Sequence, residues 1–393
     1  MKNSIGEIIV AVLFFAIIIS FGAWNLIKPD ESTSILENRK LEQRPDFTIE
    51  SMISGNYFGR FQTYHSDQFP LRSSWIELKS KIERIAFGQN LVKGTYISDD
   101  GYLIQTLVTN ERSVKPEEIA SRINTFASNV KDDVDIYFSL IPNKTTIMEE
   151  KIPDYIVSNA NKQSDLLLKE LANVKNITAL DLRDTIEPHS NEENLYFFTD
   201  HHWKPKGAHY AYEYIINRMR ENNGDIEEPI PSNKFTWEES EAEFYGSDAR
   251  RTTASYATRT DTVTIVTPKF EEEDFEICYR GSCDRDFYDL AYLDIPDKYT
   301  NRYMIYFSGD VPEGIIRNPN VTNNEKLLIL KDSYANPLIQ FLSRSFSETR
   351  VLDLRHYNSK TVYEYIEDNN ITTVLFVHNI NSLITTPGLT DIN

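Results

Sequence analysis

The sequence predicts an α/β protein in which helices cover both faces of a parallel sheet, preceded by one helix that spans a membrane. Apolar strands alternate with amphipathic helices along most of the chain, which favours a parallel sheet. A nearly uninterrupted apolar run covers residues 8–27, close to the roughly 20 residues that a transmembrane helix needs. A chain of 393 residues has room for one large domain with an insertion.

The apolar run has a rival interpretation as a cleaved signal peptide. The apolar part of a signal peptide is usually about 7–15 residues long and ends before a small-x-small cleavage site. The run here is longer, and no convincing Ala-x-Ala site follows it. We therefore expect an uncleaved membrane anchor over residues 1–29. Lys2 and Lys28 stand on its two sides, so the positive-inside rule does not fix its orientation.

Local patterns predict the first elements behind the anchor. Residues 30–65 are polar and mixed in charge, and they indicate a stalk. A helix is predicted over 72–87, where apolar residues recur at steps of three and four: Trp75, Leu78, Ile82 and Ile85. Residues 94–103 are typical of a hairpin with an Asp-Gly turn. We group 30–110 as a stalk with an N-terminal helical and hairpin segment, and 111–393 as the main α/β domain.

The alternation of helices and strands then runs to the end of the chain with one interruption. The predicted helices cover 116–130, 163–172, 336–343 and 359–369, and the predicted strands cover 134–140, 177–182, 327–330, 350–354 and 372–377. Residues from about 225 to 325 break this pattern. Within them, 252–266 is rich in threonine and β-branched residues and suggests strands. We interpret the whole interruption as an inserted β-rich subdomain or lid.

Charge and cysteine content narrow the class of function. Lysine and arginine number 41 against 60 acidic residues, giving a formal charge of −19, which argues against a nucleic-acid-binding surface but not against neutral sugars. Cys278 and Cys283 are either a small disulfide loop formed outside the cell or a coincidental pair of thiols. No second pair of cysteines or histidines lies nearby for a zinc site. No metal, nucleotide or other cofactor is expected.

A polar cluster stands out at residues 198–208, Phe-Thr-Asp-His-His-Trp-Lys-Pro-Lys-Gly-Ala. Pro205 suits a first helical turn, because the N–H that it lacks would have no partner there. The cluster is therefore predicted on a loop that a buried helix holds in place, where catalytic groups are often found. Asp200 lies two residues before His202, and such an aspartate can hold an imidazole in one tautomer and stabilise its charged form.

Ser333 is the candidate nucleophile. It follows the buried strand 327–330 and precedes an apolar helix, as in the nucleophile turn of esterases, although the flanking glycines of the Gly-x-Ser-x-Gly form are absent. Ligands of parallel sheets bind beyond the carboxyl ends of the strands, where Ser333, Asn143-Lys144 and His378-Asn379 are expected. The alternative is that Ser333 only caps the next helix, a position that serine favours.

These motifs together resemble a known family. The pattern Asp200-x-His202-Trp203, with Lys-Pro-Lys-Gly-Ala behind it and Asp-Ser-Tyr at 332–334, resembles the alginate O-acetyltransferase group of SGNH-hydrolase-like proteins, and within it the DHHW family. Further segments agree in order from about residue 36 to the end, apart from roughly 250–320: Glu37-Asn38-Arg39, residues 67–72, Gly101-Tyr102-Leu103, residues 141–144 and Ile152-Pro153. The resemblance implies a three-layer α/β/α fold outside the membrane.

The resemblance also implies a catalytic triad, with Ser333 as nucleophile, His202 as its base and Asp200 as the group that orients His202. The family pattern selects His202 rather than His201. The backbone amide of Ser333 is the natural first donor to an oxyanion. The family adds a glycine amide and an asparagine side chain, for which Gly246 and Asn379 are candidates. Lys331 replaces the glycine that the hydrolases carry before Asp-Ser.

Three further residues are candidates for substrate binding, each with a plainer alternative. Trp203 either stacks on a sugar or supports the loop from the core. Lys144 and Arg251 either hold a ligand or make an ion pair or surface contacts.

The resemblance implies an extracytoplasmic O-acetyltransferase that modifies a cell-surface or secreted polysaccharide through an acetyl-Ser333 intermediate. In relatives, a multispanning membrane O-acyltransferase delivers the acetyl group. One alternative is a carbohydrate acetyl esterase with the same triad, in which water accepts the acyl group. Another is a non-catalytic polysaccharide-binding scaffold, against which the intact triad argues.

Overall fold

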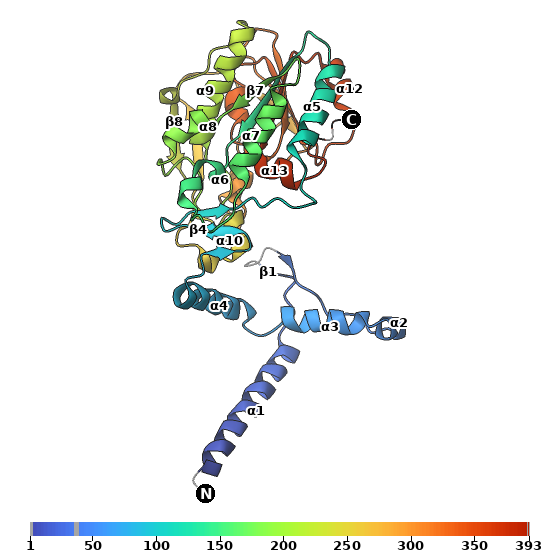
Figure 1. Cartoon of the computed structure of the whole chain (residues 1–393), viewed down its shortest axis with the longest axis vertical. Helices are drawn as coiled ribbons and strands as arrows, with labels where there is room; N and C mark the ends of the chain where they lie inside the picture. The colour runs from blue at the N-terminus through green and yellow to red at the C-terminus, as the bar shows by residue number, and fades with distance from the viewer. Residues whose placement is uncertain (1–2, 35–38, 391, 393) are drawn as a thin grey trace. The chain divides into compact units, whose positions relative to one another are not determined.

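The computed structural model describes residues 3–34, 39–390 and 392. Glu37 and Asn38, part of the segment that agrees with the family, lie outside this range. The chain divides into two compact units (Figure 1), one made of Met1–Gln89 with Arg250–Tyr256 and the other of Asn90–Ala249 with Ala257–Asn393.

The first unit is mainly helical. Helix α1 (Asn3–Ile27) contains the apolar run, and within it Ile5–Asn25 is long and apolar enough to cross a membrane, with none of its most apolar stretch buried. It is followed by β1 (Thr33–Ser34), β2 (Arg39–Lys40), α2 (Ile49–Ile53), α3 (Asn56–Asp67) and α4 (Arg72–Phe87). The segment predicted as a stalk therefore contains α2 and most of α3. Helix α4 has the predicted bounds.

The second unit is built around a seven-stranded sheet with the order β10-β11-β13-β12-β14-β6-β7. The strands are β6 (Asp135–Ile141), β7 (Thr178–Asp181), β10 (Glu276–Tyr279), β11 (Glu313–Arg317), β12 (Lys326–Lys331), β13 (Glu348–Leu352) and β14 (Thr373–Asn379). All the predicted strands outside the interruption are present, with small shifts at their ends. Neighbouring strands in the part β13-β12-β14-β6-β7 are parallel. Strands β10 and β11 are antiparallel to their neighbours, so the sheet is mixed rather than purely parallel.

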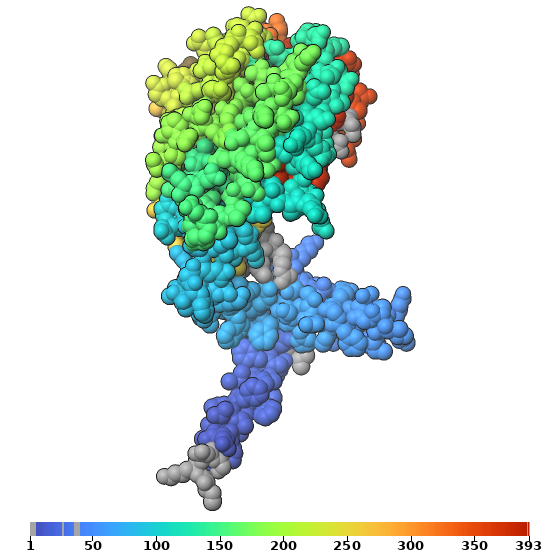
Figure 2. Space-filling view, viewed as in Figure 1, coloured from blue at the N-terminus to red at the C-terminus, as the bar shows by residue number. Residues whose placement is uncertain are grey.

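Helices cover both faces of this sheet, which confirms the three-layer architecture. Leu327 and Ile329 of β12 belong to one buried cluster with α9 (Pro205–Asn222) and α11 (Ile339–Leu342). Leu328 and Leu330 belong to a second cluster, with α5 (Pro116–Asn129), α7 (Ala160–Leu171), α12 (Val362–Asn369) and α13 (Ile380–Thr385). Successive strand residues point to opposite faces, so a strand covered on both sides is apolar throughout. Figure 1 labels α5 and α7 on the near side of this unit, and in the space-filling view of Figure 2 the teal and green atoms of this part of the chain form the near surface.

The predicted insertion is only partly separate from the main sheet. Strands β8 (Phe235–Glu239) and β9 (Thr264–Pro268) form their own antiparallel pair, but β10 and β11 extend the central sheet. The strand prediction over 252–266 is wrong for most of its length, since α10 (Ser247–Thr252) and a 3-10 turn, η4 (Ala254–Tyr256), precede β9. Hydroxyl side chains there bond locally, as Thr253 does with Ser255, and such bonds compete with strand pairing.

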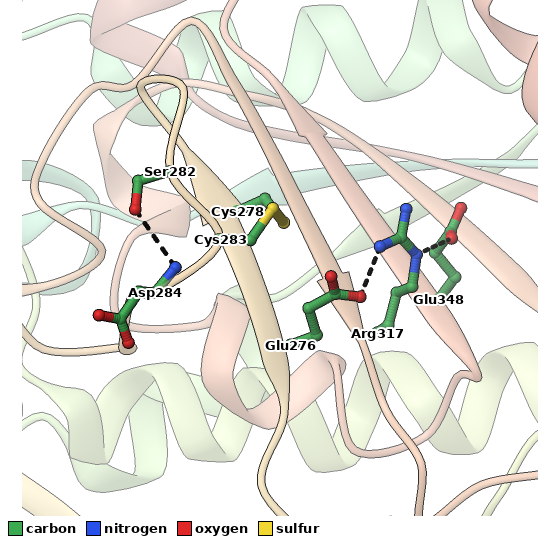
Figure 3. Close-up of a disulfide and its surroundings, with 7 residues drawn as sticks. All are labelled: Glu276, Cys278, Ser282, Cys283, Asp284, Arg317 and Glu348. Atoms are coloured by element: carbon green, nitrogen blue, oxygen red, sulfur yellow. Dashed lines mark hydrogen bonds and ion pairs between the residues drawn. A yellow bond between two sulfur atoms is a disulfide. The ribbon is translucent and has the colours of Figure 1, made fainter.

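A disulfide joins Cys278 of β10 to Cys283 (Figure 3). Beside it, Arg317 of β11 pairs with Glu276 of β10 and Glu348 of β13. These ion pairs cross the antiparallel edge of the sheet. The disulfide closes the turn that follows β10, the strand at this edge of the sheet.

The predicted hairpin is confirmed as β4 (Thr95–Ile97) and β5 (Leu103–Gln105), which form a small sheet with β3 (Leu91–Val92). The backbone N–H of Leu103 donates to the carbonyl of Phe198, at 2.8 Å. The hairpin therefore belongs with the α/β unit, and the predicted boundary near residue 110 falls inside that unit.

Candidate active site

Asp200, His202 and Ser333 form a hydrogen-bonded row at the carboxyl edge of the sheet. The Oγ atom of Ser333 lies 2.7 Å from Nε2 of His202. The Nδ1 atom of His202 lies 2.6 Å from Oδ1 of Asp200. The structure thus brings together the three residues that the sequence singled out. A carboxylate beside Nδ1 places the proton on that nitrogen, which leaves Nε2 able to accept the serine proton.

A short turn holds Ser333 directly after strand β12. Ser333 begins a 3-10 turn, η7 (Ser333–Ala335), whose N-cap is Asp332. One oxygen of Asp332 accepts the Tyr334 N–H at 2.9 Å, and the other accepts both the backbone and side-chain N–H of Asn379. The predicted helix over 336–343 is shorter than expected and consists of α11, because i→i−3 hydrogen bonds continue the tight turns up to it. Asp332 therefore fixes the serine turn to the end of β14.

Lys331, which replaces a glycine of related hydrolases, is a fully buried cation. Its ammonium group contacts Asp310 at 2.9 Å, Asn336 at 2.8 Å and Asp353 at 3.5 Å. Arg355 pairs with both of these aspartates. The contact with Asn336 ties the chain before Ser333 to the chain just after it.

Backbone donors hold Asp200, and a second aspartate that was not predicted, Asp261, holds the loop just before it. The Ser247 N–H donates to Oδ2 of Asp200 at 2.8 Å, and the His202 N–H donates to Oδ1 at 3.1 Å. Asp261 accepts the N–H groups of Phe198 and Thr199, each at 2.7 Å, and the Thr199 hydroxyl. Asp261 lies in the segment wrongly predicted as strands, and no local motif marks it.

The N–H groups of Gly246 and Asn379, for which an oxyanion role is predicted, donate to other protein groups in the structure. The Gly246 N–H donates to the Thr199 hydroxyl at 2.8 Å. The side-chain amide of Asn379 donates to Asp332 at 2.7 Å and to Ser382 at 2.6 Å. An oxyanion donor must be free to meet the developing charge. Among the described residues, the Ser333 backbone N–H has no acceptor in hydrogen-bonding distance, so it is the donor available at the nucleophile.

Gly246 has a different function, which is to make room for Asp200. A Cβ atom at this position would lie 2.3 Å from the Asp200 Cβ and 2.5 Å from its Cα. We expect Gly246→Ala to push Asp200 away from His202 and to lower kcat/KM about 100-fold, as displacements of about 1 Å do at catalytic sites. The rate on an activated acetyl ester measures this. The control is Gly224→Ala, because nothing lies within 4 Å of the Cβ it adds, and equal rates in both variants would contradict the assignment.

Two aromatic residues, Tyr303 and Trp203, support the row formed by Asp200, His202 and Ser333. The ring of Tyr303 stacks on the His202 imidazole, with centroids 3.6 Å apart and planes 3° apart, and its hydroxyl donates to the Ser333 carbonyl at 2.6 Å. Trp203 is fully buried and its indole N–H donates to the Tyr334 carbonyl at 2.8 Å. The Trp203 side chain therefore supports the loop from the core and does not face a sugar. Tyr303 was not predicted, because it stands in no recognisable motif.

Of the remaining residues, Lys144 and Arg251 form no hydrogen bond or ion pair with the row of Asp200, His202 and Ser333 in the described part of the chain, whereas the His201 ring lies 3.7 Å from that of His202. Lys144 is buried, and its ammonium contacts Asp248 at 3.1 Å and the carbonyls of Leu103 and Phe198, which is the ion-pair alternative. Arg251 is exposed on α10. The half-buried ring of His201 contacts the Ser247 hydroxyl at 2.6 Å and lines a pocket of about 180 Å³. Other residues of this pocket are Gln105, Asn143, Tyr334, Asn381 and Ser382.

Burial and neighbouring charges set the protonation of the row. Burial and, to a smaller extent, the neighbouring His201 lower the pKa of His202 to about 4, against the opposing effect of Asp200. Burial alone would raise the pKa of Asp200, but the electrostatic interactions with His202 and His201 and the hydrogen bonds from the His202 ring and the Ser247 N–H outweigh it and hold that pKa well below its ordinary value. At neutral pH the imidazole is therefore neutral and the carboxylate ionised, which is the state that a general base needs.

This protonation state predicts the pH dependence of the reaction. A base is active when unprotonated, so kcat/KM is expected to stay level from neutral pH downward and to fall about tenfold per pH unit below the His202 pKa of about 4. The pH–rate profile on an activated acetyl ester measures this, with circular dichroism at each pH to show that the fold persists. An acid limb centred near 6.5, the ordinary histidine value, would contradict the burial argument.

Comparisons with known proteins place these features in a family. A family model described as DHHW protein matches residues 107–352. No curated protein matches the chain. The fold is similar to that of Bacillus cereus PatB1 with a sulfonyl adduct, at 27% identity and a TM-score of 0.63, covering 76% of this chain and 97% of that one. It is also similar to a DHHW family protein from Eubacterium siraeum, at 24% identity and a TM-score of 0.62, covering 76% and 95%.

A more distant similarity is to the O-acetyltransferase domain of Pseudomonas putida AlgJ, at 13% identity and a TM-score of 0.44, covering 76% and 95%. The family model spans more than half of the chain, and it includes the loop that carries Asp200 and the turn that carries Ser333. The chain belongs to the DHHW family.

Proposed function

We propose that this protein is an O-acetyltransferase that moves acetyl groups onto polysaccharide hydroxyls through an acetyl-Ser333 intermediate. The observation that carries the proposal is the row in which Ser333 Oγ lies 2.7 Å from His202 Nε2 and His202 Nδ1 lies 2.6 Å from Asp200. A serine hydroxyl becomes a useful nucleophile when an adjacent base accepts its proton. The solved PatB1 structure carries a sulfonyl adduct, the kind of product that a nucleophilic side chain forms.

In the first half-reaction, Ser333 Oγ attacks the carbonyl carbon of the acetyl donor, and its proton passes to His202 Nε2. Asp200 stabilises the imidazolium that results. The carbonyl oxygen becomes an oxyanion, to which the Ser333 N–H donates. When the tetrahedral intermediate collapses, the bond to the donor oxygen breaks and His202 returns the proton to that oxygen. Acetyl-Ser333 and the free donor alcohol are the products.

The second half-reaction runs the same steps toward the acceptor. A sugar hydroxyl gives its proton to His202 and attacks the acetyl carbon of acetyl-Ser333. The bond to Ser333 Oγ then breaks, and His202 returns the proton to the serine. The acetyl ester is now on the sugar and the enzyme is unchanged.

The location of the reaction is also part of the proposal. Helix α1 is the proposed uncleaved anchor, and the second unit lies on the extracytoplasmic side. The Cys278–Cys283 disulfide supports this placement, because disulfides persist in oxidising compartments. A multispanning membrane O-acyltransferase is the proposed source of acetyl groups.

One assay separates transfer from hydrolysis. The purified full chain is given an activated acetyl ester with and without an oligosaccharide acceptor, and the products are identified by mass spectrometry. Acetylated oligosaccharide, formed by the wild type and not by Ser333→Ala, supports the proposal. Release of acetate alone would show an esterase. Failure to form any acetyl-enzyme would leave a non-catalytic polysaccharide-binding role.

A further inference from the structure

Helix α4 presents a continuous apolar stripe to solvent. Trp75 and Leu78 are each 47% exposed, Ile82 is 48% exposed and Ile85 is 84% exposed. These residues recur at steps of three and four, so they share one side of the helix. Leu71 at the N-cap continues the stripe and is 49% exposed. Large contiguous apolar patches are rare on soluble surfaces and mark interaction sites.

The opposite side of α4 already has a partner within the first unit. The Ser80 hydroxyl lies 3.3 Å from that of Thr253. Arg84 donates to the Tyr256 carbonyl at 3.3 Å, and the Tyr256 hydroxyl donates to Glu83 at 3.0 Å. The helix is therefore docked through its polar side, which leaves the apolar side outward.

Ring contacts connect the stripe to the apolar helix α1. Phe21 of α1 stacks on Phe69 with centroids 5.7 Å apart, and its ring lies 6.5 Å from that of Trp75. Trp24 lies 6.1 Å from the same Phe21 ring. The stripe thus begins beside the last turns of the proposed span. Tryptophan is enriched at membrane–water interfaces, where the ring meets apolar chains and its N–H meets water.

The borders of the stripe carry lysines. With about 3.6 residues per turn, Lys79 and Lys81 fall on its two sides, and both are exposed. Lys79 also pairs with Glu83 at 3.2 Å. Lysine stems can lie along apolar surface while their ammonium groups stay in water. An apolar stripe between lysines is typical of helices that lie in a membrane interface.

We propose that α4 lies in the interface of the lipid bilayer, with Leu71, Trp75, Leu78, Ile82 and Ile85 against the acyl chains. The proposal rests on α1 being the membrane span. It gives the protein a second attachment to the same membrane, beside the anchor. The occupant of the stripe is lipid, because the stripe continues from the apolar surface of α1 and has lysines on both borders.

The test uses the full chain in phosphatidylcholine vesicles with and without bromine on the acyl chains, which quenches nearby tryptophan. The tryptophan variants are Trp24→Phe, Trp75→Phe and Trp237→Phe, and each difference from wild type isolates one fluorophore. We expect bromolipid to quench the Trp75 emission, because the ring of an interfacial helix lies at the boundary of the acyl chains, and to leave the emission of Trp237 of β8 unchanged. Circular dichroism of each variant shows that the substitution keeps the fold.

Each outcome separates the proposal from the anchor on which it rests. Quenching of Trp24 without quenching of Trp75 would support α1 as the membrane span and overturn the proposal that α4 lies in the interface. Absence of quenching at both positions would overturn the span itself. The measurement is repeated at two lipid-to-protein ratios. Trp75 quenching that falls as the chains become crowded would identify the stripe as a contact between copies and overturn the lipid assignment.

Discussion

Ser333→Ala is expected to abolish acyl transfer, with a fall in kcat of about 10⁶-fold, as found when the nucleophile of a serine triad is removed. The substitution deletes only the hydroxyl, which is hydrogen-bonded to His202. The turn around it is held by Asp332, Asn379 and Lys331, none of which the substitution touches. Stability should therefore change little while the chemistry stops.

Two measurements check this result. Intact mass after treatment with an aromatic sulfonyl fluoride should show one adduct on the wild type and none on Ser333→Ala. Turnover of an activated acetyl ester should show the corresponding loss of rate. Ser121→Ala, at an exposed serine of α5, is the matched control and should keep both signals. A sulfonyl adduct that persists on Ser333→Ala would place the nucleophile elsewhere.

Asp200→Asn is expected to lower kcat/KM about 10⁴-fold, the size of effect seen when a triad carboxylate becomes an amide. The two oxygens of Asp200 face different donors, the His202 ring and the Ser247 N–H. If the amide oxygen faces Ser247, the NH₂ group donates to Nδ1 and favours the tautomer whose proton is on Nε2. Nε2 then cannot accept the serine proton. If the amide is reversed, its NH₂ meets the Ser247 N–H and one donor is left unsatisfied.

Steady-state rates at neutral pH measure this loss, and reactivity toward the sulfonyl reagent should fall with them. Asp184→Asn, at an exposed aspartate of the second unit, controls for the change of charge. Asp200→Asn with a rate within about tenfold of wild type would show that His202 does not depend on this carboxylate.

Local patterns predicted the elements whose signal lies within one short segment. The apolar runs of β6, β12 and β14 mark buried strands because both faces of the sheet are covered. The Asp200-x-His202 spacing and the strand–serine–helix order at Ser333 are likewise local, and together with the family resemblance they predicted the three residues that the structure brings together.

The features that sequence reasoning missed depend on distant partners. Strand β11 pairs with β13, and β10 pairs with β11 at the edge of the sheet, so their places depend on strands distant in sequence. Asp261 contacts Thr199 in the loop, and Tyr303 contacts His202 and Ser333. Both stand in segments without a recognisable motif. Gly246 was predicted as an oxyanion donor, and only the structure shows its close approach to Asp200. Lys331 was noticed as a departure from the family, and its partners Asp310 and Asp353 lie too far along the chain to be inferred.

The separation of the triad along the chain has a consequence for when activity appears. His202 and Ser333 are 131 positions apart, and the lysine before the serine takes its partners from residues 310 and 353. Ser333 therefore has no activating base until the C-terminal strands, β12 to β14, have joined the sheet. In a newly made or unfolded chain, Ser333 is therefore not activated toward acyl donors. Recovery of esterase signal during refolding should be among the last events, following the return of helical and strand structure.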